Sequence, residues 1–366
     1  MSGDLAVALG IFLASAVVVI YLGNQLAKYG DALATLTGWG RLFVGSILVA
    51  LATSLPELST NISAVRLDPP NPELALGNVM GANMVNMFTL AVVALFFGGK
   101  RFLQQVAPEQ GYLILLAAIM TGLGILFAAV KMDLSLWQIG LSSVILLVVY
   151  TVGMRVVYVK RPQEAEGDGA DSSAGMSLRR AWVMFGLISA GVVVAGFFLA
   201  YSVDQIATIT GIASSTLGIL AVSLVTTMPE AAATIAAARM GAADLGVGNI
   251  YGSCVFNIII LSLADPFYRQ GILVNQSEAA HFVAGGMALL LILFGLVLIL
   301  GRNRMHRFLV MAGLALMAAL YLAGAVVVAT LGAPDDGALS EGSTVGSGEA
   351  AVGKSGNSPV ETAVET

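Results

Sequence analysis

Two short motifs place a glutamate beside hydroxyl residues and a proline inside long apolar runs. The first motif is Thr53, Ser54, Leu55, Pro56 and Glu57, and the second is Thr226, Thr227, Met228, Pro229 and Glu230. A charged side chain at the depth of a lipid bilayer costs several kcal/mol, so such residues are rare there and usually mark an ion or substrate pathway. Because the motif occurs twice in matched surroundings, we interpret both copies as parts of one functional site.

Each motif offers only oxygen atoms to a bound ion. On a helix, the residues three and four positions before a glutamate share its face, so the hydroxyls of each motif are expected to line up with its own carboxylate. The proline lacks an N–H and crowds the carbonyl four residues earlier, which is that of Ala52 or Val225. The freed carbonyl either binds a cation or, in the alternative, accepts a hydrogen bond from a neighbouring Ser or Thr in a packing kink.

A second duplicated block follows each motif. Asn86 stands four residues after Ala82, and Asn257 stands four residues after Ser253, which is again a spacing that shares one helix face. A single membrane Asn usually joins two helices, but duplication beside a duplicated glutamate favours Asn86 and Asn257 as ion ligands. The other duplicated residues are interpreted as structural, with Asn78 and Asn249 as hydrogen-bonding groups and Gly77, Gly81, Gly248 and Gly252 as points of close helix approach.

The available ligands favour a hard cation. Carboxylate, amide, hydroxyl and carbonyl oxygens suit Ca²⁺ or Na⁺ and suit zinc or copper poorly. The two histidines, His281 and His306, lie near the ends of apolar runs, and the single Cys254 excludes an intramolecular disulfide and a thiolate metal cluster. Together Glu57 and Glu230 carry two negative charges, which one Ca²⁺, two Na⁺ or two protons neutralise. Mutually exclusive occupancy of one site by these ions is what an exchanger needs.

The composition is that of a polytopic membrane protein. Of 366 residues, 58% are hydrophobic and 11% are charged, whereas a soluble domain has about 25% charged residues. An apolar run of about 20 residues is long enough for a helix to cross the bilayer. The sequence predicts an all-α membrane protein with ten transmembrane helices, at about 5–22, 39–65, 74–98, 109–130, 134–158, 181–203, 212–238, 245–264, 279–300 and 307–331.

The distribution of Lys and Arg predicts the orientation of these helices. If the segment between the fifth and sixth spans is cytoplasmic, only Arg66, Lys131, Arg269 and Lys354 of the 17 basic residues lie outside. Both termini are then external. No basic residue precedes the first apolar run, which is also longer than the core of a signal peptide. We therefore interpret it as a retained helix of a plasma-membrane protein.

The two halves of the chain are related. Thr37–Glu57 aligns with Thr210–Glu230, and Gly77–Asn86 aligns with Gly248–Asn257, at nearly the same spacing along the chain. Because five spans per half is an odd number, the second copy enters the membrane upside down, as in many secondary transporters. The predicted divisions are a first five-helix repeat (1–159, motif region 37–98), a flexible cytoplasmic linker (160–180), an inverted second repeat (181–331, motif region 210–264) and a disordered acidic tail (332–366).

The paired pattern resembles a known family. Ser/Thr–x–Pro–Glu, then Gly–Asn, then Gly–Ser–x–x–x–Asn, twice in a ten-span chain, resembles the alpha repeats of the calcium/cation antiporter superfamily, with greatest similarity to prokaryotic sodium/calcium exchangers. The resemblance implies alternating access, in which helix pairs 2–3 and 7–8 form central ion sites while the long tilted helices 1 and 6 slide across them. It implies Glu57 and Glu230 as central Ca²⁺ ligands shared with Na⁺, completed by Thr53, Ser54, Asn86, Thr226, Thr227, Ser253 and Asn257 and by the backbone carbonyls of Ala50 and Ser223.

Two positions depart from the family pattern. Ala82 stands where the first repeat usually has Ser, which removes one hydroxyl ligand. Asn257 stands where some relatives have Asp, and an acid there is linked to K⁺ in potassium-dependent relatives. The resemblance therefore implies an exchanger that does not depend on K⁺.

The resemblance implies exchange of Na⁺ for Ca²⁺, with the transported ions and the lipid bilayer as partners and with no cofactor and no nucleic acid. The alternative is a proton-coupled Ca²⁺/cation antiporter on the same fold, because glutamates serve both couplings. An intramembrane enzyme is disfavoured, because the predicted spans contain no HExxH motif, no Gly–x–Ser–Gly signal and no paired aspartates. A passive channel does not require an inverted repeat with one acid in each half.

Overall fold

The computed structural model describes residues 2–37, 53–160, 176–241 and 243–333, which belong to one compact unit, Met1–Ala333. Several predictions lie partly or wholly outside these ranges. They concern the start of the span at 39–65, most of the linker at 160–180, nearly all of the tail at 332–366 and the carbonyl of Ala50.

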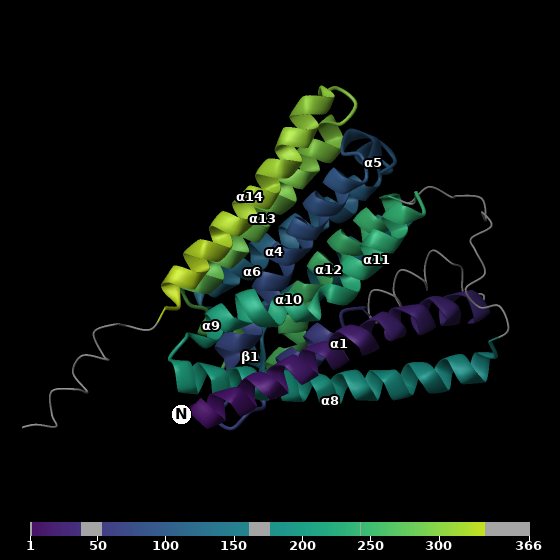
Figure 1. Cartoon of the computed structure of the whole chain (residues 1–366). Coiled ribbons are helices and arrows are strands. Elements are labelled where there is room, and N and C mark those ends of the chain that lie inside the picture. The colour runs from purple at the N-terminus through teal and green to yellow at the C-terminus, as the bar shows by residue number, and fades with distance from the viewer. Residues whose placement is uncertain (1, 38–52, 161–175, 242, 334–366) are drawn as a thin grey trace, which may run out of the picture. The chain divides into compact units, whose positions relative to one another are not determined.

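The described secondary structure is almost entirely helical, as predicted (Figure 1). The first half contains α1 (Ser2–Thr37), α3 (Leu55–Val65), α4 (Pro72–Phe96), α5 (Lys100–Gln104), α6 (Gln110–Val130), the short strands β1 (Ser135–Leu136) and β2 (Ile139–Gly140), and α7 (Leu141–Val159). The second half contains α8 (Leu178–Thr210), α9 (Ser214–Leu217), the π-helical segment η1 (Gly218–Val222), α10 (Ser223–Thr226), α11 (Met228–Arg239), α12 (Ala243–Ala264), the 3-10 segments η2 (Asp265–Phe267) and η3 (Leu273–Gln276), α13 (Ala279–Gly301) and α14 (Arg307–Leu331).

Eight of the described helices are long and apolar enough to cross a membrane. The pair Ser214–Thr226 and Met228–Arg239, bent by 43°, makes a ninth if it is counted as one broken span. The remaining predicted span, 39–65, is described only from Thr53 onward, where α3 forms its second part. The chain is therefore a helical membrane protein, and the count of ten spans stays a prediction.

Two predicted boundaries are wrong by more than a few residues. The span predicted at 181–203 is part of the longer helix α8, whereas the span predicted at 5–22 matches the apolar part of α1, Gly3–Gln25. The span predicted at 134–158 begins as a hairpin, because β1 pairs with β2 and helix α7 starts only afterwards. Trp137 and Gln138 form the turn with φ angles of 54° and 69°, the backbone that a two-residue hairpin turn requires.

The two longest helices pack against each other. In Figure 1, α1 and α8 lie side by side and run antiparallel. A shallow apolar groove between them is lined by residues of 11–22 from α1 and of 190–198 from α8. By contrast, α4 and α12 are the most buried of the eight candidate spans, with 72% and 78% of their apolar windows inside the protein. These two central helices carry the asparagines of the second duplicated block.

Glycines allow α4 to approach the broken span at backbone distance, as predicted for Gly77 and Gly81. A Cβ at Gly77 would lie 2.5 Å from the carbonyl oxygen of Ser215, and one at Gly81 would lie 2.7 Å from Ser223 Oγ. In the second half, a Cβ at Gly252 would meet no described atom within 4 Å. The contact predicted for that glycine is therefore not found within the described residues.

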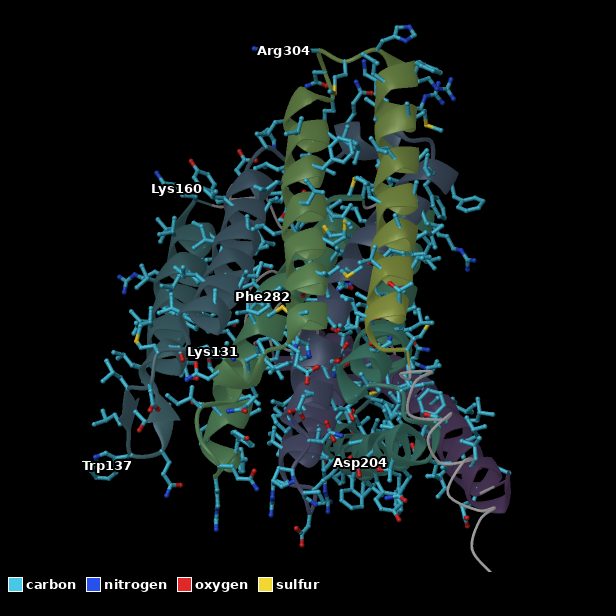
Figure 2. The ribbon with its side chains drawn as sticks, turned by 90° about the vertical axis from the view of Figure 1, so that its left-hand side faces the viewer. Lys131, Trp137, Lys160, Asp204, Phe282 and Arg304 are labelled. Carbon is cyan, nitrogen blue, oxygen red and sulfur yellow. The ribbon has the colours of Figure 1, made fainter. Side chains whose placement is uncertain are left out.

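Loop anchors fix the ends of the central helices. Asn71 caps α4 by accepting from the backbone N–H of Leu74 at 3.0 Å, and its amide donates to Asp204 of α8 at 2.7 Å. Figure 2 shows Asp204 and Trp137 toward one end of the molecule and Arg304 toward the other. The polar ends of the bundle are thus separated along the helix direction by the apolar spans.

Candidate cation site

Both motifs interrupt a helix just before the proline. Ser54 precedes α3 with φ −91° and ψ 7°, and Thr227, its counterpart in the second motif, separates α10 from α11 with φ −83° and ψ 1°. A proline favours such a break because it lacks an N–H and crowds the preceding turn. The expectation that all hydroxyls share a helix face with their own glutamate is wrong for Ser54, whose Oγ donates to Oε1 of Glu230 at 3.1 Å.

The two glutamates meet in the protein interior. Glu57 lies in the first turn of α3 and Glu230 in the first turn of α11, and both are 0% exposed. Their carboxylates are close enough to interact electrostatically. Within the described ranges, no third His, Cys, Asp or Glu joins them in a metal-binding cluster. The remaining oxygen atoms around the pair are therefore those of neutral groups.

Hydroxyl-bearing side chains lie beside each carboxylate. The side chain of Thr226 lies beside the carboxylate of Glu57, and those of Thr53 and Ser253 lie beside Glu230. Each carboxylate thus has a threonine from the opposite half of the chain next to it. All nine predicted side-chain ligands are buried, with at most 1% of their surface exposed: Thr53, Ser54, Glu57, Asn86, Thr226, Thr227, Glu230, Ser253 and Asn257.

Several oxygen atoms of this cluster lack a hydrogen bond of acceptable geometry. They are both carboxylate oxygens of Glu57, Oε2 of Glu230, Oγ of Ser253 and Oδ1 of Asn86 and of Asn257. A buried polar atom without a partner costs about 1–3 kcal/mol, and more when it is charged. A hard cation with 6–8 oxygen ligands, such as Ca²⁺, would give several of these atoms a partner at once. The donor set therefore fits the kind of ion that the sequence predicts.

Thr227 is held by its own broken span. Its hydroxyl donates to the backbone carbonyl of Ser223 at 2.6 Å, one turn earlier in the same broken span. The carbonyl of Ser223, which the family resemblance implies as a Na⁺ ligand, also accepts from the backbone N–H of Thr227 at 3.1 Å. In this structure the two groups satisfy each other.

The duplicated asparagines fall into two kinds. Asn249 donates to the backbone carbonyl of Glu230 and to the hydroxyl of Thr234, both at 3.1 Å, which is the structural role predicted for it. Asn78, also predicted to be structural, accepts from Thr226 at 3.1 Å and so touches a candidate ligand directly. Asn78 therefore positions the site more closely than the sequence indicates.

Asn83, which is not among the residues predicted from the sequence, is 0% exposed and lies on the central helix α4. Its Oδ1 accepts from the amide of Asn257 at 3.0 Å, and its own amide donates to Cys254 and Thr121. A usable signal was present, because Asn83 stands three residues before Asn86 and so is near it on the helix surface. Its counterpart in the second duplicated block is Cys254, so a search for duplicated residues passes over it.

The long helices pack closely on the segments that carry the motifs. A Cβ at Gly23 of α1 would overlap the ring of Pro229, and one at Gly196 of α8 would overlap the side chain of Ser59 in α3. Gly23 and Gly196 are separated along the chain by the same interval as Glu57 and Glu230. The two helices therefore contact the motif-bearing helices α11 and α3 through glycines at equivalent positions.

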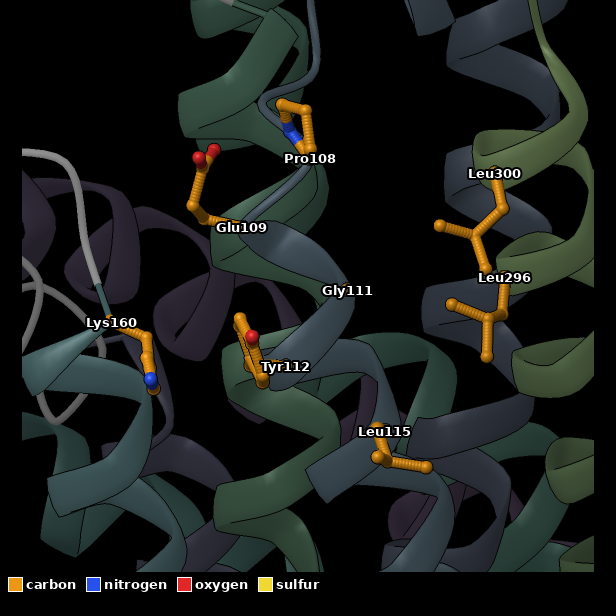
Figure 3. Close-up of a pocket in the computed structure, with 8 residues that line it drawn as sticks. All are labelled: Pro108, Glu109, Gly111, Tyr112, Leu115, Lys160, Leu296 and Leu300. Atoms are coloured by element: carbon orange, nitrogen blue, oxygen red, sulfur yellow. The ribbon is translucent and has the colours of Figure 1, made fainter.

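A separate groove of about 510 Å³ lies away from these residues. Figure 3 shows its lining, which comes from α6, the end of α7 and α13. The lining residues are Pro108, Glu109, Gly111, Tyr112, Leu115, Lys160, Leu296 and Leu300. None of them is a predicted ligand, so the groove is not part of the candidate cation site.

The fold and the site define a helical membrane protein with a buried carboxylate pair that has hydroxyl-bearing side chains from both halves of the chain beside it. Such an interior is typical of proteins that move ions across a membrane. The chain belongs to the sodium/calcium exchanger protein family, whose model matches residues 7–158 and 180–333.

The chain is also similar to other membrane proteins in sequence and to solved structures in fold. The inner membrane protein YrbG of Escherichia coli (strain K12) is 27% identical over 254 residues, which make up 66% of this chain and 74% of that protein. A structure of the sodium-calcium exchanger NCX_Mj has a TM-score of 0.55 at 21% identity and covers 87% of this chain and 97% of its own. The H⁺/Ca²⁺ exchanger CAX has a TM-score of 0.63 at 14% identity and covers 89% and 90%. The chain shares its fold with both exchangers.

Proposed function

We propose that this chain is a secondary active antiporter that exchanges Na⁺ for Ca²⁺ across the plasma membrane. The observation that carries the proposal is the meeting of Glu57 and Glu230, one from each half, in a buried cluster in which both carboxylate oxygens of Glu57 and Oε2 of Glu230 lack a hydrogen bond from the protein. One Ca²⁺ or two Na⁺ neutralise this pair, so the two cargoes compete for one site. A third Na⁺ bound nearby makes the exchange electrogenic.

The proposed transport cycle is alternating access at this site. The close contacts of α1 with Pro229 and of α8 with Ser59 support it, because a shift of either long helix changes what covers the glutamates. The proposed architecture is ten helices in two inverted five-helix repeats, with the cytoplasmic linker at 160–180 and both termini outside. The excess of basic residues in the segments assigned to the cytoplasm supports this orientation.

Proton coupling is the second candidate. Two protons neutralise the same carboxylate pair, and the chain shares its fold with an H⁺/Ca²⁺ exchanger. The glutamates serve either coupling ion equally well, so flux measurements must distinguish them.

The first test is Ca²⁺ uptake into liposomes that contain the purified protein. Vesicles loaded with Na⁺ and diluted into Na⁺-free medium are expected to take up Ca²⁺, and uptake should fall at least about tenfold in Glu57→Gln and in Glu230→Gln. Each substitution removes one charge of the pair that neutralises the ion, and tenfold corresponds to about 1.4 kcal/mol. Glu109→Gln, a change in the separate groove, is the matched control and should transport like the wild type.

The same vesicles separate the two coupling ions. Uptake that follows an imposed pH gradient and ignores Na⁺ would assign the protein to proton coupling. Uptake that needs no counter-gradient, or full activity in both Gln variants, would contradict an antiporter built on these glutamates.

A further inference from the structure

Asn257 is the only one of the two predicted asparagine ligands whose amide is held by another side chain among the described residues. Its nitrogen donates to Oδ1 of Asn83 at 3.0 Å, and its own Oδ1 has no partner. By contrast, neither amide atom of Asn86 has a hydrogen bond of acceptable geometry, and its neighbour is the thiol of Cys254. The duplicated residues are therefore held differently in the two halves.

The orientation of the Asn83 amide follows from its partners. Its nitrogen lies 3.2 Å from the backbone carbonyl oxygen of Cys254 and 3.3 Å from the hydroxyl of Thr121. A carbonyl oxygen only accepts hydrogen bonds, so the atom of Asn83 that faces it must be the NH₂ group. The other end of the amide, Oδ1, then faces Asn257 as an acceptor.

The orientation of the Asn257 amide follows from that of Asn83. Because Oδ1 of Asn83 only accepts, the atom of Asn257 that meets it must be the NH₂ group. Oδ1 of Asn257 is thereby directed away from Asn83 and remains available. Ser253, one turn earlier on the same face of α12, lies beside the carboxylate of Glu230, so this face of the helix belongs to the cation site.

We propose that Asn83 is a positioning residue that holds the Asn257 amide with its oxygen, and not its NH₂ group, toward the transported cation. The proposal rests on the proposed cation site. A freely turning amide would present its NH₂ donors to a cation for part of the time, and these cannot ligate it. The chain of bonds from Cys254 through Asn83 to Asn257 removes that misorientation before the ion arrives.

Asn257→Asp provides the background that tests this role. An aspartate has oxygen at both terminal positions, so its ability to ligate a cation does not depend on which way the group turns. Replacing Asn83 by Leu, which has a similar size and no polar atoms, should therefore weaken Ca²⁺ binding in the wild-type background and not in the Asn257→Asp background. A purely structural role for Asn83 would weaken both backgrounds by the same factor.

The experiment measures Ca²⁺ affinity in two ways for the full chain. Half-saturating Ca²⁺ is taken from exchange in liposomes, and equilibrium affinity is taken from the Ca²⁺ dependence of thermal unfolding in detergent. Asn83→Leu is expected to raise both half-saturating Ca²⁺ and the equilibrium dissociation constant about three- to tenfold, the effect of losing one hydrogen-bonded interaction. In the Asn257→Asp background the same change should shift them less than twofold.

Thr121→Val is the matched control. It removes one acceptor of the Asn83 amide and leaves the Cys254 carbonyl, so Ca²⁺ affinity should stay within twofold of the wild type. If Asn83→Leu does not fold, Asn83→Ala replaces it in both backgrounds.

The outcomes separate this inference from the proposed function. If Asn83→Leu weakens Ca²⁺ affinity by the same factor in both backgrounds, or changes it in neither, the role of Asn83 is overturned. The proposed function still stands in that case, provided that the wild type exchanges Ca²⁺ for Na⁺. A wild type that neither binds Ca²⁺ nor exchanges it would overturn both.

Discussion

The hydroxyl of Ser54 joins the two halves of the site, because it donates to the Glu230 carboxylate across 176 positions of the chain. Hydrogen bonds to charged groups contribute about 1.5–3 kcal/mol. Ser54→Ala removes this donor and leaves the carboxylate less well held, so half-saturating Ca²⁺ should rise about tenfold in the liposome exchange assay.

Ser54→Thr is the control for this substitution. The repeat-related position is Thr227, which has the same backbone conformation as Ser54, so the position accommodates a threonine and keeps its hydroxyl. Ca²⁺ affinity should stay within twofold of the wild type. An alanine variant with unchanged affinity would show that the bond between Ser54 and Glu230 does not hold the site.

At the level of single residues, duplication identified the centre of the site. The sequence identifies Glu57, Glu230 and their hydroxyl neighbours, because a glutamate that occurs twice in matched apolar surroundings has few structural explanations. Which hydroxyl meets which carboxylate was not predictable from helical spacing, because the break before each proline redirects Ser54 toward the other half. Asn83 was not predicted, because its counterpart in the second half is a cysteine and its hydrogen-bond network therefore has no repeated sequence pattern.

At the level of elements, the long helices approach the motif-bearing segments closely because a glycine, which has no side chain, stands at each point of contact. A Cβ at Gly23 or Gly196 would overlap Pro229 or Ser59, and such overpacking typically costs about 1–3 kcal/mol. Gly23→Ala and Gly196→Ala should each lower the initial rate of exchange about tenfold, because the added methyl group pushes α1 or α8 away from the segment that it contacts.

Each of these helices also contains its own control. Gly10 in α1 and Gly186 in α8 have open space where a Cβ would lie. Gly10→Ala and Gly186→Ala should therefore transport within twofold of the wild type. If all four variants behave alike, close packing of α1 and α8 on the motifs plays no part in transport.

The elements themselves were predictable where the chain is uniformly apolar. The span at 307–331 has the predicted bounds, and that at 279–300 differs by one residue. The predicted span at 5–22 matches the apolar part of α1, Gly3–Gln25, and the helix then continues to Thr37. Tertiary packing extends a helix beyond its apolar core, and a search for apolar runs cannot detect this.

At the level of the whole molecule, the inverted arrangement follows from an odd number of crossings between related segments. Between the hairpin at Trp137 and the turn at Arg304 lie four candidate spans, α7, α8, α12 and α13, and the broken span α9–α11. If the broken span crosses the membrane, five crossings separate Trp137 from Arg304 and place these two residues on opposite sides of the membrane. Figure 2 shows Trp137 and Arg304 at opposite ends of the molecule, as this arrangement requires.

Cysteine labelling measures this topology directly, because the single native cysteine, Cys254, is 0% exposed and should react little. Trp137 is 92% exposed and Arg304 is also exposed, so a cysteine at either position is accessible to a maleimide. Since basic residues favour the cytoplasm, an impermeant maleimide should label Trp137→Cys in intact cells and Arg304→Cys only after permeabilisation. The wild type controls for Cys254. The reverse pattern would mean that the chain is inserted in the opposite orientation, whereas labelling of both positions from one side would require an even number of crossings and contradict the inverted repeat.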